Sequence, residues 1–183
     1  LTLGEEGFAE LVFDHPGASM NTFGREAVRE FSEALQSLER NPAVKGLLIS
    51  SGKSSFMAGA DVTEFEPVFA AGEAGIAQFL QANIDNFERL ESLPFATVVA
   101  LNGVALGGAL EMSLACDFRV ASERASIGLT FNRIGLHPDW GGTWLLPRLV
   151  GRSRAFELMA SGRMVPAAEA ETLGMVDRVV PAA

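Results

Sequence analysis

The sequence of 183 residues contains a single cysteine, Cys116, and only two histidines, His15 and His137. One cysteine cannot build a disulfide framework or a thiolate metal cluster. Because the two histidines form no pair at helical spacing, we expect no catalytic metal. The apolar neighbours of Cys116 favour a buried, inert thiol over a reactive one.

Positive charge is also scarce, since 14 Lys and Arg residues stand against 23 Asp and Glu residues and give a net charge of −9. Such an acidic chain lacks the electrostatic footprint of a nucleic-acid or membrane-surface protein, so we expect neither partner. No apolar run reaches the roughly 18 residues of a membrane span. The first residues also lack the pattern of a secretory signal. We therefore expect a soluble, cytoplasmic protein.

Three common ligand-binding and hydrolase motifs are missing. Residues 51–54, Ser-Gly-Lys-Ser, resemble the end of a phosphate-binding loop, but the upstream glycine, Gly46, is one residue too far away. The glycines of residues 103–108 follow the spacing GxxxGG, which is not the GxGxxG of dinucleotide-binding folds. No GxSxG nucleophile elbow is present. These spacings argue against a nucleotide-dependent oxidoreductase and against a serine triad.

What is present is an apolar content of 48%, enough for one domain over residues 1–183 with a sizeable core. Apolar runs and helical periodicities alternate along the chain, which predicts an α/β fold with largely parallel strands. We expect strands at 8–13, 44–49, 96–101, 118–121, 126–128 and 176–180, and helices at 23–40, 73–92, 107–115, 141–150, 153–160 and 166–173.

Two glycine-rich turns, residues 56–62 and 102–111, each follow one of these apolar strands. Small residues allow a backbone N–H group to approach a ligand atom closely. The second turn also opens a helix, whose first N–H groups are unpaired and carry positive potential. Two such donors on one carbonyl oxygen stabilise negative charge there, so the turns indicate enolate or acyl chemistry.

These turns belong to a longer set of motifs that resembles the crotonase (enoyl-CoA hydratase/isomerase) superfamily. The matching segments keep the family's order and spacing over essentially the whole chain: FMAGADV at 56–62, NGVALGGALE at 102–111, LACDFRVA at 114–121, IGLHPDWGGT at 134–143, LPRLVG at 146–151 and AETLGMVD at 170–177. The resemblance implies a spiral of ββα units, a coenzyme A thioester as substrate with no further cofactor, and a homotrimer or hexamer. Relatives continue with further helices, so we expect that C-terminal helical part to be absent here.

The resemblance also assigns roles to backbone groups. The N–H groups of Ala60 and Gly108 match the family's oxyanion-hole positions, which would hold the thioester carbonyl. Ala58, Asp61 and Val62 match positions that line the adenine end of coenzyme A. The alternative is that these small residues serve only tight turns and close helix packing.

Two carboxylates are candidates for proton transfer. Glu111 matches one of the two catalytic glutamates of the hydratases, although the dipole of its own helix would also favour an acid there. The second glutamate falls at Phe131, which can neither orient water nor move a proton. Asp139 stands where several isomerases of the family carry an aspartate, and the alternative for it is an N-cap of the following helix. We interpret the nearby His137 as a loop coincidence, not as a partner of Asp139.

The Phe131 substitution decides our functional prediction. We expect an enoyl-CoA isomerase of fatty acid metabolism, in which Glu111 and Asp139 share the proton transfer. Hydration of an enoyl-CoA, a lyase reaction, is the main alternative. A subunit that binds acyl-CoA without catalysis is the second, and hydrolysis of the thioester in the same hole is a weaker third.

Overall fold

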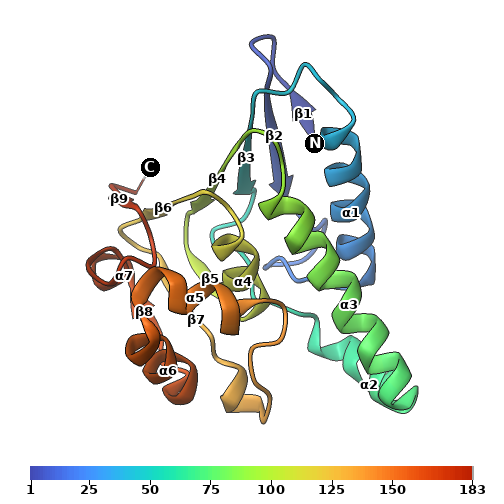
Figure 1. Ribbon diagram of the computed structural model, residues 1–183, viewed down its shortest axis with the longest axis vertical. Helices are drawn as coiled ribbons and strands as arrows, with labels where there is room; N and C mark the ends of the chain where they lie inside the picture. Colours follow the sequence, from blue (N-terminus) through green and yellow to red (C-terminus); the bar gives the residue numbers. More distant parts are fainter. Residues whose placement is uncertain (183) are drawn as a thin grey trace.

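The computed structural model describes residues 1–182, and its largest feature is a six-stranded sheet (Figure 1). The strand order is β1-β2-β3-β4-β6-β9, and every neighbouring pair is parallel except β1 with β2. Parallel neighbours require crossover connections, which the helices supply. The strands are β1 (Thr2–Leu3), β2 (Phe8–Phe13), β3 (Gly46–Ser51), β4 (Ala96–Leu101), β6 (Phe118–Ser122) and β9 (Arg178–Val180).

A second, three-stranded sheet consists of β5 (Val104–Leu106), β7 (Ser126–Gly128) and β8 (Val165–Pro166). Strand β5 pairs with β7 in parallel, and β7 pairs with β8 in antiparallel orientation. Because β5 follows β4 after only two residues, the chain passes from the large sheet directly into the small one. This passage carries the second glycine-rich turn to the interior of the molecule.

Helices α1 (Arg25–Glu39) and α3 (Gly72–Glu91) run side by side over one face of the large sheet (Figure 1). The spacing of Phe31, Leu35 and Leu38 places all three on the buried face of α1. The Phe31 ring meets Phe13 of β2, with 5.7 Å between the ring centroids. Helix α1 is therefore held on the sheet by one apolar stripe.

The short helix α4 (Gly108–Leu114) lies inside the fold, and all seven of its residues are buried. The later helices, α5 (Gly142–Val150), α6 (Arg152–Ser161) and α7 (Ala167–Leu173), occupy the opposite side of the molecule from α1 and α3 (Figure 1). Because α5 packs against α4, this second group of helices encloses the N-terminal end of α4 together with the small sheet.

Every strand and helix predicted from the sequence is present in the described residues, with ends within two residues of the expected ones. The α/β class with mostly parallel strands is confirmed. The sequence prediction missed β1, β5, β8, α2 (Phe65–Ala70) and two short 3₁₀ segments, Val62–Glu64 and Phe131–Ile134. Helix α2 escaped notice because it is only six residues long, contains Pro67 and runs into Gly72, whose φ is +68°.

Membrane-spanning helices, metal sites and the state of Cys116 are three expectations from composition, and the structure of residues 1–182 bears on each. Within that range no helix combines the length and apolarity that crossing a bilayer demands. The same residues bring together no group of three His, Cys, Asp or Glu side chains able to hold a metal ion. Cys116 is buried as expected, and burial raises the pKa of its thiol to about 12, which disfavours the reactive thiolate. Ala183, the last residue of the expected C-terminal connection, lies outside the described residues.

Candidate active site

The fold brings the two glycine-rich turns together. The amide of Met57 donates to the carbonyl of Val104 at 3.0 Å, and the amide of Leu106 donates to the carbonyl of Met57 at 3.1 Å. Met57 and Ala105 thereby form a parallel bridge between the first turn and β5. The two segments, about fifty residues apart in the sequence, therefore run side by side as they approach α4.

The first turn leaves the amide of Ala60 available. On one side of this residue Gly59 accepts from the amide of Phe23 at 2.7 Å, and on the other side Asp61 donates to the carbonyl of Phe23 at 3.2 Å. The amide of Ala60 itself donates to no other group in the described part of the chain. A buried or half-buried donor of this kind normally finds a partner, so Ala60 is a candidate ligand donor.

The amide of Gly108 is the second candidate donor. Gly108 is the first residue of α4, so its N–H group has no partner within the helix. The first turn approaches it closely: a Cβ atom on Gly59 would lie 3.4 Å from the Gly108 nitrogen and only 2.8 Å from the Leu106 oxygen. Gly59 also has φ +87°, a conformation that favours glycine. Glycine at this position thus lets the two donor-bearing backbones approach.

Two aromatic rings cover the backbone at the start of α4. The ring of Trp140 lies directly against Gly108, so that a Cβ atom on Gly108 would overlap it. The ring of Phe131 lies over Gly107, where a Cβ atom would be 3.4 Å from the nearest ring carbon. Trp140 is 3% exposed, whereas Phe131 is only partly buried. The surroundings of the candidate donors are therefore largely apolar, which strengthens any electrostatic interaction there.

Glu111 is completely buried one turn into α4, and its carboxylate faces the start of α5. Its Oε1 atom accepts hydrogen bonds from the amides of Trp140 at 3.0 Å and Gly142 at 2.8 Å. Its Oε2 atom has no partner among the described residues. One oxygen is thus held firmly by two backbone donors, and the other is free to exchange a proton.

The protonation of Glu111 follows from this environment. Burial, helped by the negative charge of Asp139, raises the pKa of the carboxyl group to about 8, although the hydrogen bonds from the Gly142 and Trp140 amides oppose the rise. Glu111 is therefore mostly protonated at neutral pH. The sequence alternative, that Glu111 serves the dipole of its own helix, does not describe these contacts, since the carboxylate binds the N-terminus of α5.

Asp139 is half-buried and stands next to this pair of helices. Burial raises the pKa of its carboxyl group, and the charge of His137 lowers it. The alternative of an N-cap is wrong, because Gly141 occupies the N-cap position of α5, and the amide of its first residue, Gly142, donates to Glu111 and not to Asp139. The His137 ring pairs with the Pro138 carbonyl at 3.0 Å, and no hydrogen bond or ion pair between His137 and Asp139 occurs in residues 1–182. The geometry thus agrees with the interpretation of His137 as a loop residue.

The three residues expected at the adenine end of coenzyme A lie within the first turn. The amide of Ala58 is used, since it donates to the carbonyl of Asn21 at 2.9 Å. Asp61 accepts from the Thr63 amide at 3.0 Å and from its hydroxyl at 2.6 Å, and these bonds lower the pKa of Asp61. Val62 is 58% exposed. Asp61 therefore has a structural role in the turn, and Val62 offers an accessible apolar surface.

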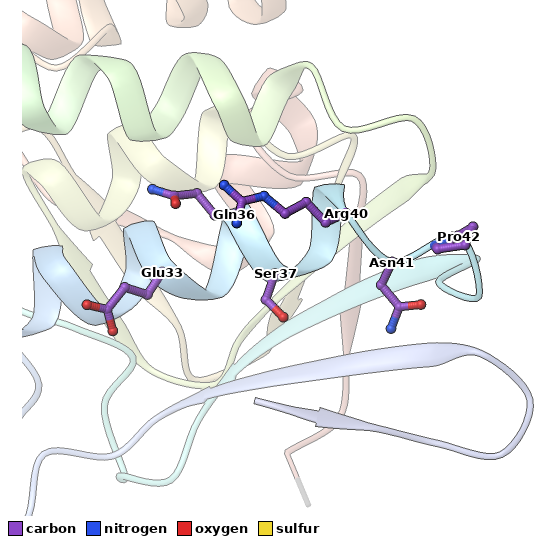
Figure 2. Close-up of a pocket in the computed structure, with 6 residues that line it drawn as sticks. All are labelled: Glu33, Gln36, Ser37, Arg40, Asn41 and Pro42. Atoms are coloured by element: carbon purple, nitrogen blue, oxygen red, sulfur yellow. The ribbon is translucent and has the colours of Figure 1, made fainter.

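Three surface depressions lie away from the candidate carboxylates Glu111 and Asp139. They have volumes of about 430, 650 and 770 Å³ and surround α1, and only the second includes a candidate residue, Asp61. Figure 2 shows the first, a shallow hollow at the C-terminal end of α1 lined by Glu33, Gln36, Ser37, Arg40, Asn41 and Pro42. None of the three is lined by Glu111 or Asp139. The candidate site is therefore defined by its donors and carboxylates, and these hollows are separate features.

Sequence reasoning missed the backbone groups that hold Glu111. The donors are the backbone amides of Trp140 and Gly142, and no pattern of side chains in the sequence predicts them. The available signal was Gly141-Gly142 directly before a helical stretch, because a glycine at a helix start allows another chain to approach its free amides closely. The indole nitrogen of Trp140 is a further buried donor that has no partner in the described residues.

Comparisons with known proteins bear on the family and the fold of the chain. The profile of the enoyl-CoA hydratase/isomerase family matches residues 4–183. The chain is 42% identical to the fatty acid oxidation complex subunit alpha of Psychrobacter sp. (strain PRwf-1) over 98% of its own length. Among solved structures, the enoyl-CoA hydratase of Bacillus anthracis has 35% identity and a TM-score of 0.86 over 94% of this chain and 66% of that one. DspI of Pseudomonas aeruginosa has 32% identity and a TM-score of 0.88, over 99% and 68%.

The matches cover a larger share of this chain than of its relatives. The chain spans only 25% of the length of the Psychrobacter relative, and about two thirds of each of the two solved structures. The similarity therefore covers almost all of this chain, including every candidate residue, but only the N-terminal part of these relatives.

Proposed function

The chain belongs to the enoyl-CoA hydratase/isomerase family and has the crotonase fold, and we propose that it moves the double bond of an enoyl-CoA thioester. The observation that carries this proposal is the buried Glu111 carboxyl group, with one oxygen fixed by two amides and the other unpartnered. It lies three residues after Gly108 on the same helix as this proposed oxyanion donor.

The first step is binding of the thioester carbonyl by the amides of Ala60 and Gly108. When the C2 proton leaves a 3-enoyl thioester, the electron pair moves onto the carbonyl oxygen and gives a dienolate. Two preorganised amide donors stabilise that negative charge more than they stabilise the neutral carbonyl, which lowers the barrier. Loss of one such donor typically costs about 2.7–4 kcal/mol of transition-state stabilisation.

The proton transfers are divided between two carboxyl groups with different environments. Asp139, which is more exposed than Glu111, acts as the base that removes the C2 proton. Glu111, with a pKa of about 8, is protonated at neutral pH and delivers its proton to C4. The double bond then lies between C2 and C3, and solvent returns the proton from Asp139 to Glu111.

Water addition is the runner-up because the family contains hydratases. That reaction uses two carboxylates on one water molecule, and the second position holds Phe131, whose ring lies over Gly107. A phenyl ring provides neither a hydrogen-bond acceptor for the water nor a proton. The apolar ring therefore favours isomerisation over hydration. Binding of acyl-CoA without catalysis is the remaining alternative, and thioester hydrolysis is the weakest.

The deciding experiment incubates the purified chain separately with crotonyl-CoA and with trans-3-hexenoyl-CoA. We expect conversion of 3-hexenoyl-CoA to its 2-enoyl isomer without change of mass, followed by ultraviolet absorbance and chromatography. A mass gain of one water from crotonyl-CoA, with the 3-enoyl compound untouched, would overturn the isomerase proposal. Tight binding of both thioesters without any product would indicate a binding subunit, and release of free thiol would indicate hydrolysis.

Three secondary expectations belong to the same proposal. Coenzyme A enters only as part of the substrate, so extensive dialysis against a chelator should leave turnover unchanged.

We also propose self-association into trimers, which is supported by the family resemblance and by the exposed Trp144 and Phe156. Light scattering after size exclusion tests the trimer, and a monomer at micromolar concentration would contradict it. The cytoplasmic location stays a prediction, which cell fractionation would test.

A further inference from the structure

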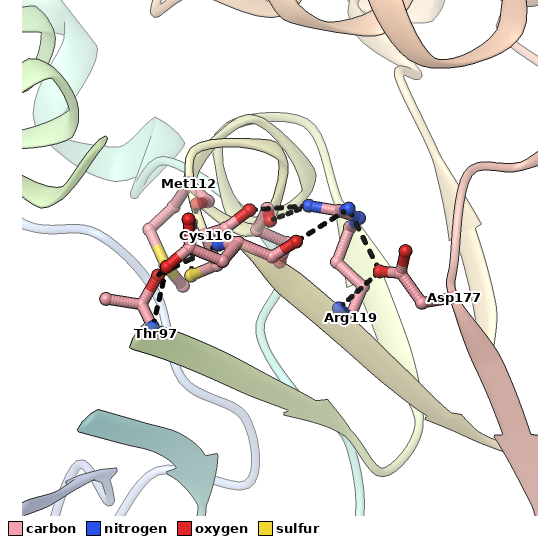
Figure 3. Close-up of polar contacts among 7 residues, drawn as sticks. Thr97, Met112, Cys116, Arg119 and Asp177 are labelled. Atoms are coloured by element: carbon pink, nitrogen blue, oxygen red, sulfur yellow. Dashed lines mark hydrogen bonds and ion pairs between the residues drawn. The ribbon is translucent and has the colours of Figure 1, made fainter. Parts of the chain in front are cut away.

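A buried arginine holds the far end of helix α4 (Figure 3). The side chain of Arg119, on β6, is 4% exposed. Its Nη1 atom donates to the carbonyls of Cys116 at 2.6 Å and Ser113 at 3.4 Å, and its Nη2 atom donates to the carbonyl of Asp117 at 3.3 Å. These carbonyls belong to the last turn of α4 and the residues that follow it, where the helix leaves acceptors unpaired. Arg119 thus occupies the negative end of the helix with a cation, which stabilises it.

The orientation of that guanidinium group is fixed by Asp177, just before β9. Its Oδ2 atom accepts from Arg119 Nη2 at 2.9 Å and from the Arg119 backbone amide at 2.8 Å. The Asp177 amide returns a hydrogen bond to the Arg119 carbonyl at 2.9 Å. Two backbone bonds and one ion pair therefore join the same two residues, and the guanidinium group has one orientation.

A second polar anchor acts on the same turn from β4. Asp117 Oδ2 accepts from the amide of Thr97 at 2.8 Å and from its hydroxyl at 3.0 Å. The Thr97 hydroxyl in turn accepts from the Asp117 amide at 2.9 Å. Both ends of the chain segment that follows α4 are thereby tied to strands of the large sheet. The end of α4 cannot move without breaking charged hydrogen bonds to the buried Arg119 and to the partly exposed Asp117 and Asp177.

The opposite end of α4 has no ion pair of this kind, and its ties are the bonds of the Glu111 carboxylate to α5 and the bond from the Gly107 amide to the Gly128 carbonyl at 2.9 Å. Its N-cap, Gly107, has no side-chain cap bond, and its first amide is the candidate ligand donor, Gly108. A side-chain cap at this point would occupy the amide that the substrate carbonyl needs. Because α4 has seven residues, its two ends are only about 10 Å apart. In a rigid helix this short, a shift at the C-terminal end is passed on to the N-terminal amide.

We infer that Arg119 and Asp177 are positioning residues for the oxyanion-binding amide of Gly108, acting through α4. Neither residue touches the substrate. They fix the helix along its axis from the C-terminal end, so that its N-terminal amide stays aligned with the amide of Ala60. This inference rests on the proposed function, because it concerns the same pair of donors. A displacement of about 1 Å in a catalytic group can reduce the rate by up to about a hundredfold.

The test uses acetoacetyl-CoA, a thioester that becomes an enolate by losing its C2 proton. Enolate formation is followed by ultraviolet absorbance as the pH of the protein–ligand mixture is raised. We expect the wild-type chain to lower the apparent pKa of the bound probe, because the two amides favour the anion. Arg119→Lys keeps the charge but loses the planar fork. We expect it to raise the apparent pKa of the bound probe by about one unit, to lower kcat by about tenfold and to leave KM within about twofold.

Asp177→Asn is the second variant: both bonds from Arg119 converge on one oxygen, so an amide oxygen in its place can still accept them without the charge, and we expect a smaller change of the same sign. Arg163→Lys is the matched control, because Arg163 also pairs with carboxylates, Glu157 and Glu169, on the exposed side of α6 and α7. A merely structural role would reduce the amount of folded protein without moving the pKa of the bound probe. Wild-type values in both Arg119→Lys and Asp177→Asn would overturn the positioning role. If the wild-type chain itself does not ionise the probe, the proposed function fails instead.

Should Arg119→Lys not fold, Asp177→Asn alone decides. The Asp177 side chain is 43% exposed, so this substitution places no new group in the interior, and the buried Arg119 loses its ionic partner but keeps its bonds to the carbonyls of Cys116 and Ser113. An unchanged probe pKa in that folded variant then counts against the inference, and a raised value supports it.

Discussion

The Oε1 atom of Glu111 accepts the amide proton of Gly142 at 2.8 Å, so one side chain joins the first turn of α4 to the start of α5. The same carboxyl group is the proposed acid of the reaction. The two roles belong to different oxygen atoms. Oε1 binds the two backbone amides, and Oε2, which has no partner in the described residues, is the atom proposed to carry the transferred proton. Substitutions can therefore separate the two roles.

Glu111→Gln should abolish most activity while keeping the fold. The amide oxygen of glutamine still accepts from Trp140 and Gly142, but it cannot donate an acidic proton. We expect kcat for 3-hexenoyl-CoA to fall by about 10²–10⁴-fold. Glu111→Ala removes the acceptor as well and should lower the free energy of unfolding by about 2–4 kcal/mol. Steady-state kinetics and denaturant melts measure both effects, and full turnover in Glu111→Gln would remove Glu111 from the mechanism.

The stability of the protein should fall with rising pH because of Glu111. Its pKa is about 8 in the folded chain and 4.5 as an ordinary glutamate, so the folded state binds the extra proton between these values. The stabilisation is fully present below pH 4.5 and is lost as the pH approaches 8. The slope is at most about 1.4 kcal/mol per pH unit for one group. Glu111→Gln cannot titrate, so the difference in unfolding free energy between the wild type and this variant should shrink or reverse from pH 5 to pH 8. A pH-independent difference would contradict the raised pKa.

Phe131→Glu should introduce water addition. The ring of Phe131 lies over Gly107, at the position that carries the second glutamate in the hydratases by our sequence register. A carboxylate there, together with Glu111, supplies the two groups that orient one water molecule. We expect hydration of crotonyl-CoA at least about tenfold above that of the wild type. Phe131→Gln, of similar size but without acid–base function, is the control. Equal hydration by both variants would show that the register or the role of Phe131 is wrong.

Gly108→Ala tests the close packing at the donor amide. The added methyl group would overlap the Trp140 ring, which is buried among Phe23, Phe79 and Phe87 and has no room to move. We expect a loss of about 1–3 kcal/mol in stability and a fall in kcat, since the helix start is pushed from its place. Gly4→Ala is the control, because the nearest atom to its new Cβ is 3.4 Å away. Thermal unfolding and turnover of Gly108→Ala equal to those of the control would refute the packing argument.

The sequence predicted the fold well because its elements are local patterns. Helix α1 follows from the spacing of Phe31, Leu35 and Leu38, and β4 follows from an apolar run that ends before a glycine. The glycines and the apolar runs before them located the two turns, and the family resemblance assigned the candidate donors and carboxylates. What the sequence could not predict is contact between distant backbone groups, such as the amides of Trp140 and Gly142 on Glu111. Such contacts depend on the final packing of α4 against α5, and no residue type is required to provide an amide. For the same reason, the anchoring of α4 by Arg119 appears only in the folded structure.

The last prediction concerns the coupling between the two carboxyl groups. The negative charge of Asp139 raises the pKa of Glu111, so Asp139→Asn should lower that pKa below about 8. The decline of stability with pH should then end at a lower pH, because its upper limit is the pKa of Glu111 in the folded chain. Turnover should fall by about 10²-fold or more, because the base is lost. Carboxyl ¹³C NMR of glutamate-labelled protein reports the pKa directly, and Glu111→Gln identifies the resonance. His137→Gln is the control, because the exposed ring is not part of the proposed proton transfer and should leave turnover within about twofold. An unchanged Glu111 pKa in Asp139→Asn would mean that the two carboxyl groups titrate independently. The division of the two proton transfers between them would then have no electrostatic basis.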